Sequence, residues 1–216
     1  MRRAQTDRAN RARGLYAVTP DLADVDALAA KVGAAIEGGA RIVQYRNKSL
    51  ASSARRAQAQ RLAEICLRHG VLFIVNDDPA LARDVDAGGV HVGEADGDLP
   101  HVRDIVGNDS LIGVSCYDDF ARAREGVERG ADYVAFGSFF PSTVKPGARR
   151  ATLDLLARAR ELAVPVVAIG GIDAANAASL RDAGASAVAV ISDVFAHASL
   201  ADVARHARAI AELFDP

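Results

Sequence analysis

The sequence predicts a single soluble (β/α)8 TIM barrel, and two features of the chain indicate that fold. Short apolar runs alternate with longer amphipathic segments from end to end, and several runs lack polar alternation, as expected for parallel strands covered on both faces. Eight such strand–helix units fill the 216 residues and leave no room for a second domain. The predicted strands are, in chain order, 15–18, 42–45, 72–75, 90–92, 111–114, 133–136, 166–169 and 187–191.

The segments between these runs carry helical signals. Gly39, Gly130 and Gly184 each follow a predicted helix and precede a strand, where glycine supplies a left-handed helix cap. An open doubly wound sheet is the rival fold, but no GxGxxG motif follows the first strand, so we favour a closed barrel. The clearest helix is the last, whose apolar stripe at 3.6-residue spacing comprises Leu200, Val203, Ala204, Ala207, Ile210, Ala211 and Phe214.

Composition and charge limit the cellular setting and the partners. Half of the residues are hydrophobic, a quarter are charged and the net charge is −2, so nothing directs the chain to nucleic acid or to a membrane. Cys66 and Cys116 form no CxxC motif and suit a reducing, cytoplasmic compartment. Residues 1–13 hold five Arg and one Asp but no apolar stretch, so we expect a disordered or helical basic lead-in rather than a signal peptide. Residues 14–216 would form the catalytic barrel.

Barrel active sites form where the strands end, and the second strand ends in cations. Strand alternation places Gln44, Arg46 and Lys48 on one side, so that an amide, a guanidinium and an ammonium would converge on the barrel mouth. Arg and Lys together suit a phosphate group. The alternative is a solvated strand end without a ligand.

Carboxylates follow the third and fourth strands. Asp78 precedes Pro79 and is expected to cap a helix, which leaves Asp77, beside Asn76, available at the strand tip. Asp96 follows the neighbouring strand, so the carboxylates of Asp77 and Asp96 could share a Mg²⁺ ion with substrate phosphates. His91 lies on the same strand, where a lone histidine is more often structural than functional.

The remaining strand ends add a hydroxyl, a loop and glycines. Ser115 faces the mouth, but no base partner is evident in the sequence, so a nucleophilic serine is not supported. The long loop 137–150 carries Lys145 and could act as a lid, or could be merely variable. Gly171 and Ser192 follow the seventh and eighth strands, where barrels frequently bind phosphate. Two phosphorylated small molecules would therefore meet at one mouth.

With these residues in hand, the chain resembles the thiamine phosphate synthase family along nearly its whole length, and the matching motifs occur in family order. The matches are Gln44-x-Arg46-x-Lys48, Asn76-Asp77-Asp78, Gly89-Val90-His91-Val92-Gly93 with Asp96, Gly113-Val114-Ser115, Gly130-Ala131-Asp132-Tyr133-Val134, Pro141-Ser142-x-x-Lys145, Gly170-Gly171-Ile172 and Ile191-Ser192.

The resemblance implies a transferase that joins a hydroxymethylpyrimidine diphosphate to a thiazole phosphate and releases pyrophosphate with the help of Mg²⁺. The pyrimidine diphosphate would be held by Gln44, Arg46, Lys48, Asn76, His91, Ser115 and Lys145. The thiazole phosphate would be held by Ser142, Thr143, Val144, Gly171, Ile191 and Ser192. Asp77 and Asp96 would bind the metal, and the catalytic residues would be Arg46, Lys48, Ser115 and Lys145.

Departures from the family pattern and rival functions remain. Val144 stands where the family commonly has a second Thr, so one phosphate contact would come from Thr143, backbone or water, or be absent. A thiazole tautomerase-like isomerase on the same barrel is the nearest rival, although it would need neither the metal carboxylates nor the pyrophosphate cations. A non-catalytic phosphate sensor is a second rival. The family suggests a homodimer, on which the sequence itself is silent.

Overall fold

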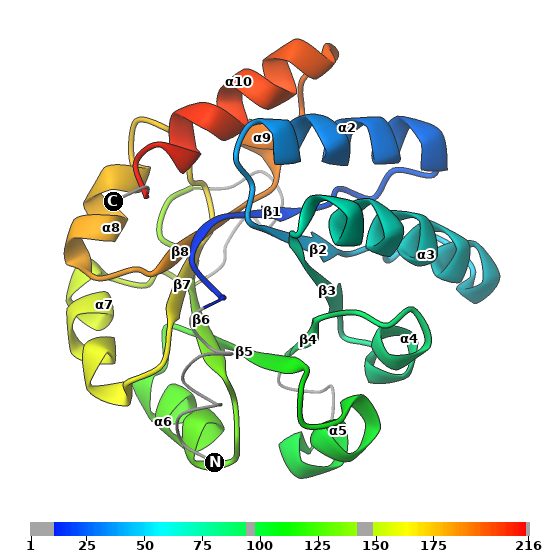
Figure 1. Ribbon diagram of the computed structural model, residues 1–216. Coiled ribbons are helices and arrows are strands. Elements are labelled where there is room, and N and C mark those ends of the chain that lie inside the picture. The colour runs from blue at the N-terminus through cyan, green and yellow to red at the C-terminus, as the bar shows by residue number, and fades with distance from the viewer. Residues whose placement is uncertain (1–10, 94–97, 142–148, 215–216) are drawn as a thin grey trace.

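The computed structural model describes residues 11–93, 98–141 and 149–214, and its strands form one closed parallel barrel (Figure 1). Each strand pairs with its sequence neighbours, and β1 pairs with β8 to close the ring. The (β/α)8 fold expected from the alternating runs is therefore confirmed. The strands are β1 (Gly14–Val18), β2 (Ile42–Tyr45), β3 (Leu72–Asn76), β4 (Gly89–Val92), β5 (Leu111–Tyr117), β6 (Tyr133–Gly137), β7 (Val166–Ile169) and β8 (Ala187–Val190).

The helices surround the barrel on its outer side (Figure 1). They are α2 (Val25–Glu37), α3 (Ser52–His69), α4 (Pro79–Asp84), α5 (Leu99–Val106), α6 (Phe120–Glu128), α7 (Leu153–Ala159) with the 3₁₀ turn η1 (Arg160–Leu162), α8 (Ala177–Ala183), α9 (Ser192–Phe195) and α10 (Leu200–Ala211). Among the described residues, no helix combines the length and the apolar character that crossing a bilayer requires.

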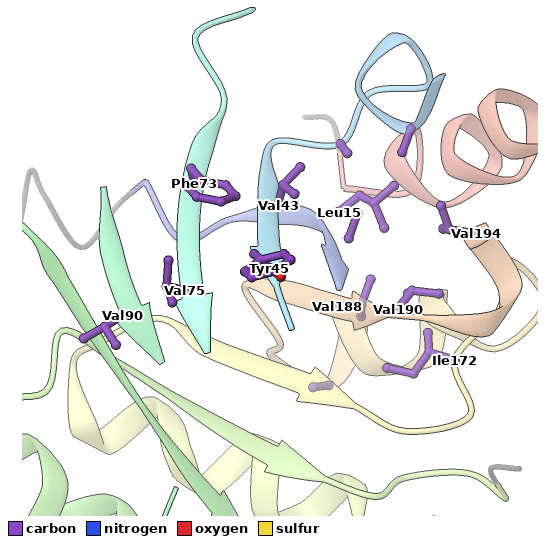
Figure 2. Close-up of a cluster of buried hydrophobic side chains, with 14 of the residues drawn as sticks. Leu15, Val43, Tyr45, Phe73, Val75, Val90, Ile172, Val188, Val190 and Val194 are labelled. Carbon is purple, nitrogen blue, oxygen red and sulfur yellow. The ribbon is translucent and has the colours of Figure 1, made fainter. Parts of the chain in front are cut away.

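Strand alternation divides the apolar residues into two cores. One face of each strand packs outward against the helices, as Leu15, Val43 and Phe73 do (Figure 2). The other face fills the barrel interior, where Tyr16 and Tyr133 are almost completely buried. Side chains therefore fill the barrel interior, and a ligand can bind only at the mouth of the barrel.

Aspartates begin several helices and thereby fix the loops at the strand ends. Asp78 accepts a hydrogen bond from the backbone N–H of Leu81 at 2.9 Å, which confirms its predicted capping role at α4. Asp119 caps α6 in the same way. The carboxylate of Asp78 therefore caps α4, whereas that of Asp77 is not part of this cap.

Several local expectations differ from the structure, and most of the differences are of one residue at a strand end. β5 runs three residues beyond its predicted end, to Tyr117, with a register shift against β6 between Ser115 and Tyr117. β8 ends at Val190, one residue before its predicted end. Leu200 was expected on the buried stripe of the last helix but is 46% exposed, because it is the first residue of α10, beside the Ser199 cap.

Candidate active site

The described residues expected in the site lie on or just after β2 to β5, β7 and β8, towards the C-terminal end of the barrel. They form three regions: a cationic loop after β2 with the β3 tip, a hydrogen-bonded chain in the interior, and a cavity after β7 and β8.

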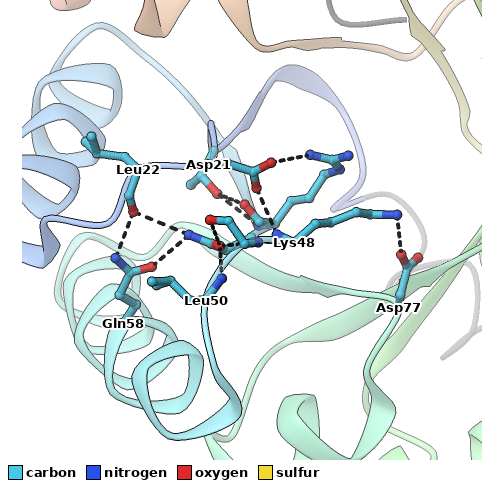
Figure 3. Close-up of polar contacts among 10 residues, drawn as sticks. Asp21, Leu22, Lys48, Leu50, Gln58 and Asp77 are labelled. Atoms are coloured by element: carbon cyan, nitrogen blue, oxygen red, sulfur yellow. Dashed lines mark hydrogen bonds and ion pairs between the residues drawn. The ribbon is translucent and has the colours of Figure 1, made fainter.

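Asp21, on the loop after β1, holds the cationic segment that follows β2 (Figure 3). One carboxylate oxygen of Asp21 accepts a hydrogen bond from the backbone N–H of Lys48 at 2.9 Å, and the other lies 3.6 Å from Nη1 of Arg46. The hydroxyl of Thr19 accepts from the backbone N–H of Arg46 at 2.9 Å and donates to its carbonyl at 3.0 Å. These bonds fix the backbone of Arg46 and Lys48 before any ligand arrives.

A second set of hydrogen bonds supports the same loop from below (Figure 3). Asn47 is buried, and its Oδ1 accepts from the backbone N–H groups of Ser49 and Leu50 at 3.0 and 3.1 Å. Gln58 on α3 is also buried, and its amide nitrogen donates to the carbonyl of Leu22 at 2.9 Å. The loop therefore has few ways to rearrange without exposing or orphaning a buried amide.

The tip of β3 places a carboxylate beside this loop. Asp77 has the positive φ of 61°, a left-handed conformation that Asp tolerates better than most residues. Its backbone N–H donates to the carbonyl of His91 at 2.8 Å, and its Oδ2 lies 3.4 Å from Nζ of Lys48. An oxygen ligand at this place has the chemistry that Mg²⁺ requires. Asn76 ends β3 opposite His91, and Asp96, the other predicted metal ligand, lies outside the described residues.

A chain of hydrogen bonds crosses the barrel interior and ends at the mouth. Gln44 Nε2 donates to the hydroxyl of Tyr16 at 2.7 Å, and that hydroxyl lies 2.9 Å from the hydroxyl of Tyr133. The Tyr133 hydroxyl lies 3.1 Å from Nδ1 of His91, whose Nε2 lies 2.9 Å from Oγ of Ser115. Five side chains from β1, β2, β4, β5 and β6 are joined in this way.

The Gln44 amide sets the direction of the whole chain. Because Tyr16 accepts from Gln44 and is only 1% exposed, its own proton needs a buried acceptor, and Tyr133 is the neighbour that offers one. Tyr133 then donates to Nδ1 of His91, and Nε2 of His91 carries the proton that is donated to Ser115. In the reverse direction, the hydroxyl proton of Tyr16 would have no acceptor in this chain, at a cost of about 1–3 kcal/mol.

This direction presents Ser115 to the mouth as a hydrogen-bond donor. Burial raises the pKa of Tyr16 and of Tyr133 well above the ordinary value, so both stay neutral and keep the chain in place. No base partner for Ser115 is evident in the sequence, but the structure places the His91 imidazole against its hydroxyl. With its Nε2 protonated, however, His91 cannot take a proton from Ser115, so a nucleophilic serine remains unsupported.

The third region is a cavity of about 360 Å³ beside β7 and β8. The predicted residues Gly171, Ile191 and Ser192 line it together, as expected for the end of the barrel that often holds phosphate. Gly171 has a φ of 65°, and a Cβ there would overlap the backbone of Phe140 and Pro141, so only glycine fits without strain.

The predicted lid has described ends but an undescribed centre. Ser142, Thr143, Val144 and Lys145 lie outside the described residues. The backbone N–H of Ser138 donates to the carbonyl of Arg149 at 3.1 Å, and that of Phe140 donates to the carbonyl of Gly170 at 2.9 Å. These bonds hold the two ends of the loop together and against the β7 end of the mouth.

Several residues of the site escaped the sequence analysis. Asp21 and Gln58 lie on other elements than the cations they hold, and nothing local marks them. Tyr16 and Tyr133 look like ordinary core aromatics in their strands. Gly113 was one available signal, because a Cβ there would overlap the Tyr133 ring.

Comparison with known proteins adds the family. A sequence model described as thiamine monophosphate synthase matches residues 15–194. The chain belongs to this family. It is 49% identical to the thiamine-phosphate synthase of Thioalkalivibrio sulfidiphilus, over 97% of this chain and 99% of that one, and 51% identical to that of an Azoarcus species, over 94% and 98%.

A solved structure has the same architecture. The thiamine phosphate pyrophosphorylase from Pyrococcus furiosus superposes with a TM-score of 0.83 at 31% identity, covering 95% of this chain and 96% of that one. The resemblance drawn from the ordered motifs is therefore confirmed, and the chain is an enzyme of thiamine phosphate synthesis. These matches do not favour the isomerase or the sensor.

Proposed function

We propose that this enzyme condenses a hydroxymethylpyrimidine diphosphate with a thiazole phosphate at the barrel mouth and releases pyrophosphate. The observation that carries this proposal is that one mouth has a cationic side and, apart from it, a cavity. Arg46 and Lys48 lie at the β2 side, whereas the cavity of Gly171, Ile191 and Ser192 lies at the β7–β8 side. A diphosphate and a monophosphate would each find a place there, with their reactive atoms meeting between them.

The charges on the β2 side suit cleavage of a carbon–oxygen bond that adds negative charge to the departing diphosphate group. As the methylene–oxygen bond of the pyrimidine substrate breaks, negative charge grows on the departing pyrophosphate and positive charge grows on the pyrimidine methylene. Arg46 and Lys48 would stabilise the former, and because Thr19 already holds the backbone of Arg46 and Asp21 that of Lys48, little reorganisation accompanies the step. Lys145 would add a third cation from the lid.

The proposed metal fits the donor chemistry of the described carboxylate. Asp77 would hold Mg²⁺ with Asp96, and the ion would supply further positive charge to the diphosphate. Asp77 pairs with Lys48 in the present arrangement, so the Lys48 ammonium would be released to the diphosphate when Asp77 takes up a cation.

The interior chain would orient the pyrimidine. Gln44 and His91 belong to the hydrogen-bonded chain that ends at Ser115, and Ser115 would offer a proton to an acceptor such as a ring nitrogen. Such a contact needs no proton transfer, which agrees with a reaction that passes through a carbocation and uses the thiazole nitrogen as its nucleophile. Asn76 would contact the diphosphate from the tip of β3.

The decisive experiment supplies both phosphorylated halves with and without Mg²⁺ and measures thiamine phosphate and pyrophosphate. We expect both products in equal amounts, and only with the metal. Pyrophosphate without thiamine phosphate would indicate a hydrolase. The absence of both products would contradict the proposal. An Arg46→Gln variant tests the charge argument, because it should lose turnover while Arg56→Gln, on an exposed ion pair of α3, should not.

We further place the enzyme in the cytoplasm, since two buried free cysteines suit a reducing compartment, and we propose a homodimer. Sedimentation of the purified protein tests the second point.

A further inference from the structure

Two histidines and an aspartate gather on the outer flank of the β7–β8 cavity. Asp193 lies on α9, His197 follows α9 by two residues, and His206 lies on α10, which packs beside α9 (Figure 1). Each residue offers a ligand atom, and the three atoms all lie within 4.8 Å of one another. The proposed synthase reaction uses none of these three side chains.

The spacing of the three atoms suits a single ion. Three atoms no more than 4.8 Å apart all lie within about 2.8 Å of one common point. Metal–nitrogen and metal–oxygen bonds of about 2.0–2.2 Å therefore require shifts of less than about 1 Å from each side chain. Side-chain rotations alone can make such shifts, because all three residues are only partly buried.

Asp193 has an oxygen that lacks a partner. Its Oδ1 lies 3.3 Å from Nδ1 of His206, but its Oδ2 is inaccessible to solvent and has no hydrogen-bond partner. A buried carboxylate oxygen without a partner costs free energy, and a cation would remove that cost. This unpartnered oxygen is an observation independent of the spacing, and it also favours a cation at this place.

His197 is held as metal-binding histidines usually are. Its Nε2 lies 2.9 Å from the carbonyl of Asp193, and a hydrogen bond to that carbonyl leaves the lone pair on Nδ1 for a metal. Nζ of Lys31 donates to the carbonyls of Phe195 and His197 at 2.8 and 2.7 Å, which fixes the turn that carries the ring. The imidazoles of His197 and His206 lie with their centroids 3.8 Å apart.

We propose that Asp193, His197 and His206 form a binding site for a divalent transition metal of the Zn²⁺ class, distinct from the Mg²⁺ expected at the mouth. Two imidazoles and one carboxylate are the ligands that Zn²⁺ takes, whereas Mg²⁺ prefers oxygen alone. Asp193 and His197 line the cavity that also contains Gly171 and Ser192, so the ion has an entry path and a position for a fourth ligand.

Calorimetric titration of the chelator-treated full chain with Zn²⁺, without substrates, tests the site. We expect one equivalent to bind, excess Mg²⁺ not to compete, and bound Co²⁺ to give the visible absorption of a nitrogen-ligated ion. His206→Gln and His197→Gln should each lower the Zn²⁺ affinity at least tenfold. His101→Gln, at an exposed position on α5, is the matched control and should not change it.

Thermal unfolding without metal checks that the variants fold, and Asp193→Asn provides a third, nearly isosteric change. Equal Zn²⁺ affinity in the wild type and in the variants at Asp193, His197 and His206 would overturn the proposal. So would an equal loss in the His101 control, because binding would then come from scattered surface histidines.

Discussion

Replacing Tyr133 with Phe tests the direction of the interior hydrogen-bond chain. The change removes one oxygen and keeps the ring, so packing around Gly113 is preserved. It also leaves the hydroxyl of Tyr16 and Nδ1 of His91, 2.9 and 3.1 Å from the lost oxygen, each without this partner. A buried polar group without a partner costs about 1–3 kcal/mol.

Tyr16 keeps the hydrogen bond that it accepts from Gln44, but its own proton loses its acceptor and Nδ1 of His91 loses its donor. We therefore expect the unfolding free energy to fall by about 2–4 kcal/mol in total. For a domain of this size, that corresponds to a fall in Tm of about 4–16 °C. Thermal and urea unfolding followed by circular dichroism measure both quantities.

The control and a second readout separate this chain from a general loss of packing. Tyr117→Phe removes the same atom from a ring that is 40% exposed and should change stability by less than about 0.5 kcal/mol. Nitrogen NMR of the imidazole should report a proton on Nε2 of His91 in the wild type and a mixture of tautomers in Tyr133→Phe. An unchanged tautomer together with unchanged stability would contradict the proposed direction of the chain.

Three further predictions address the cap, the cavity and the thiols. Asp78→Ala should lower stability by about 1 kcal/mol and retain activity. Asp77→Ala should retain stability and lose metal-dependent turnover. Loss of turnover in an Asp78 variant of unchanged stability would contradict these separate roles. Gly171→Ala should lower the unfolding free energy by at least about 1–2 kcal/mol and weaken the binding of inorganic phosphate. The control Gly33→Ala, in open space on α2, should stabilise the protein by about 0.5–1 kcal/mol. Equal phosphate affinity in both variants would contradict phosphate binding in the cavity. Burial raises the pKa of both cysteines to about 12, so the native protein should not react with Ellman's reagent at pH 8. Stability should fall as the pH rises above about 9, because the thiols of the unfolded chain ionise there while those of the folded chain do not. Rapid labelling of the native protein would show that the thiols are not buried.

The fold was predictable because its signal is periodic. Strands such as Leu72–Asn76 and Val166–Ile169 are short apolar runs. A run of that kind between two amphipathic helices is typical of a buried strand in a parallel sheet. Ends of elements were less predictable. β5 reaches Tyr117 because a register shift against β6 lets the strand continue, and no residue type in the sequence announces that shift.

The site divides in the same way. Cations and carboxylates at strand ends, such as Arg46 and Asp77, are visible because their chemistry is unusual beside an apolar run. Asp21 is not visible, since it acts on residues about 25 positions later in the sequence, and only closure of the barrel brings it there. Tyr16 and Tyr133 are hidden for the opposite reason, because they satisfy every expectation of a core residue while also carrying a hydroxyl.

The pairing of β1 with β8 has a consequence for how the protein is made. Gly14 lies opposite Ala187, so the first strand to leave the ribosome finds its second neighbour about 170 residues later. At about 5–20 residues per second, translation leaves one edge of β1 unpaired for about 9–35 s. An unpaired strand edge is a template for pairing with other chains. Nascent chains on neighbouring ribosomes are therefore the chains with which this edge could pair. The edge of β1 stays exposed until β8 pairs with it.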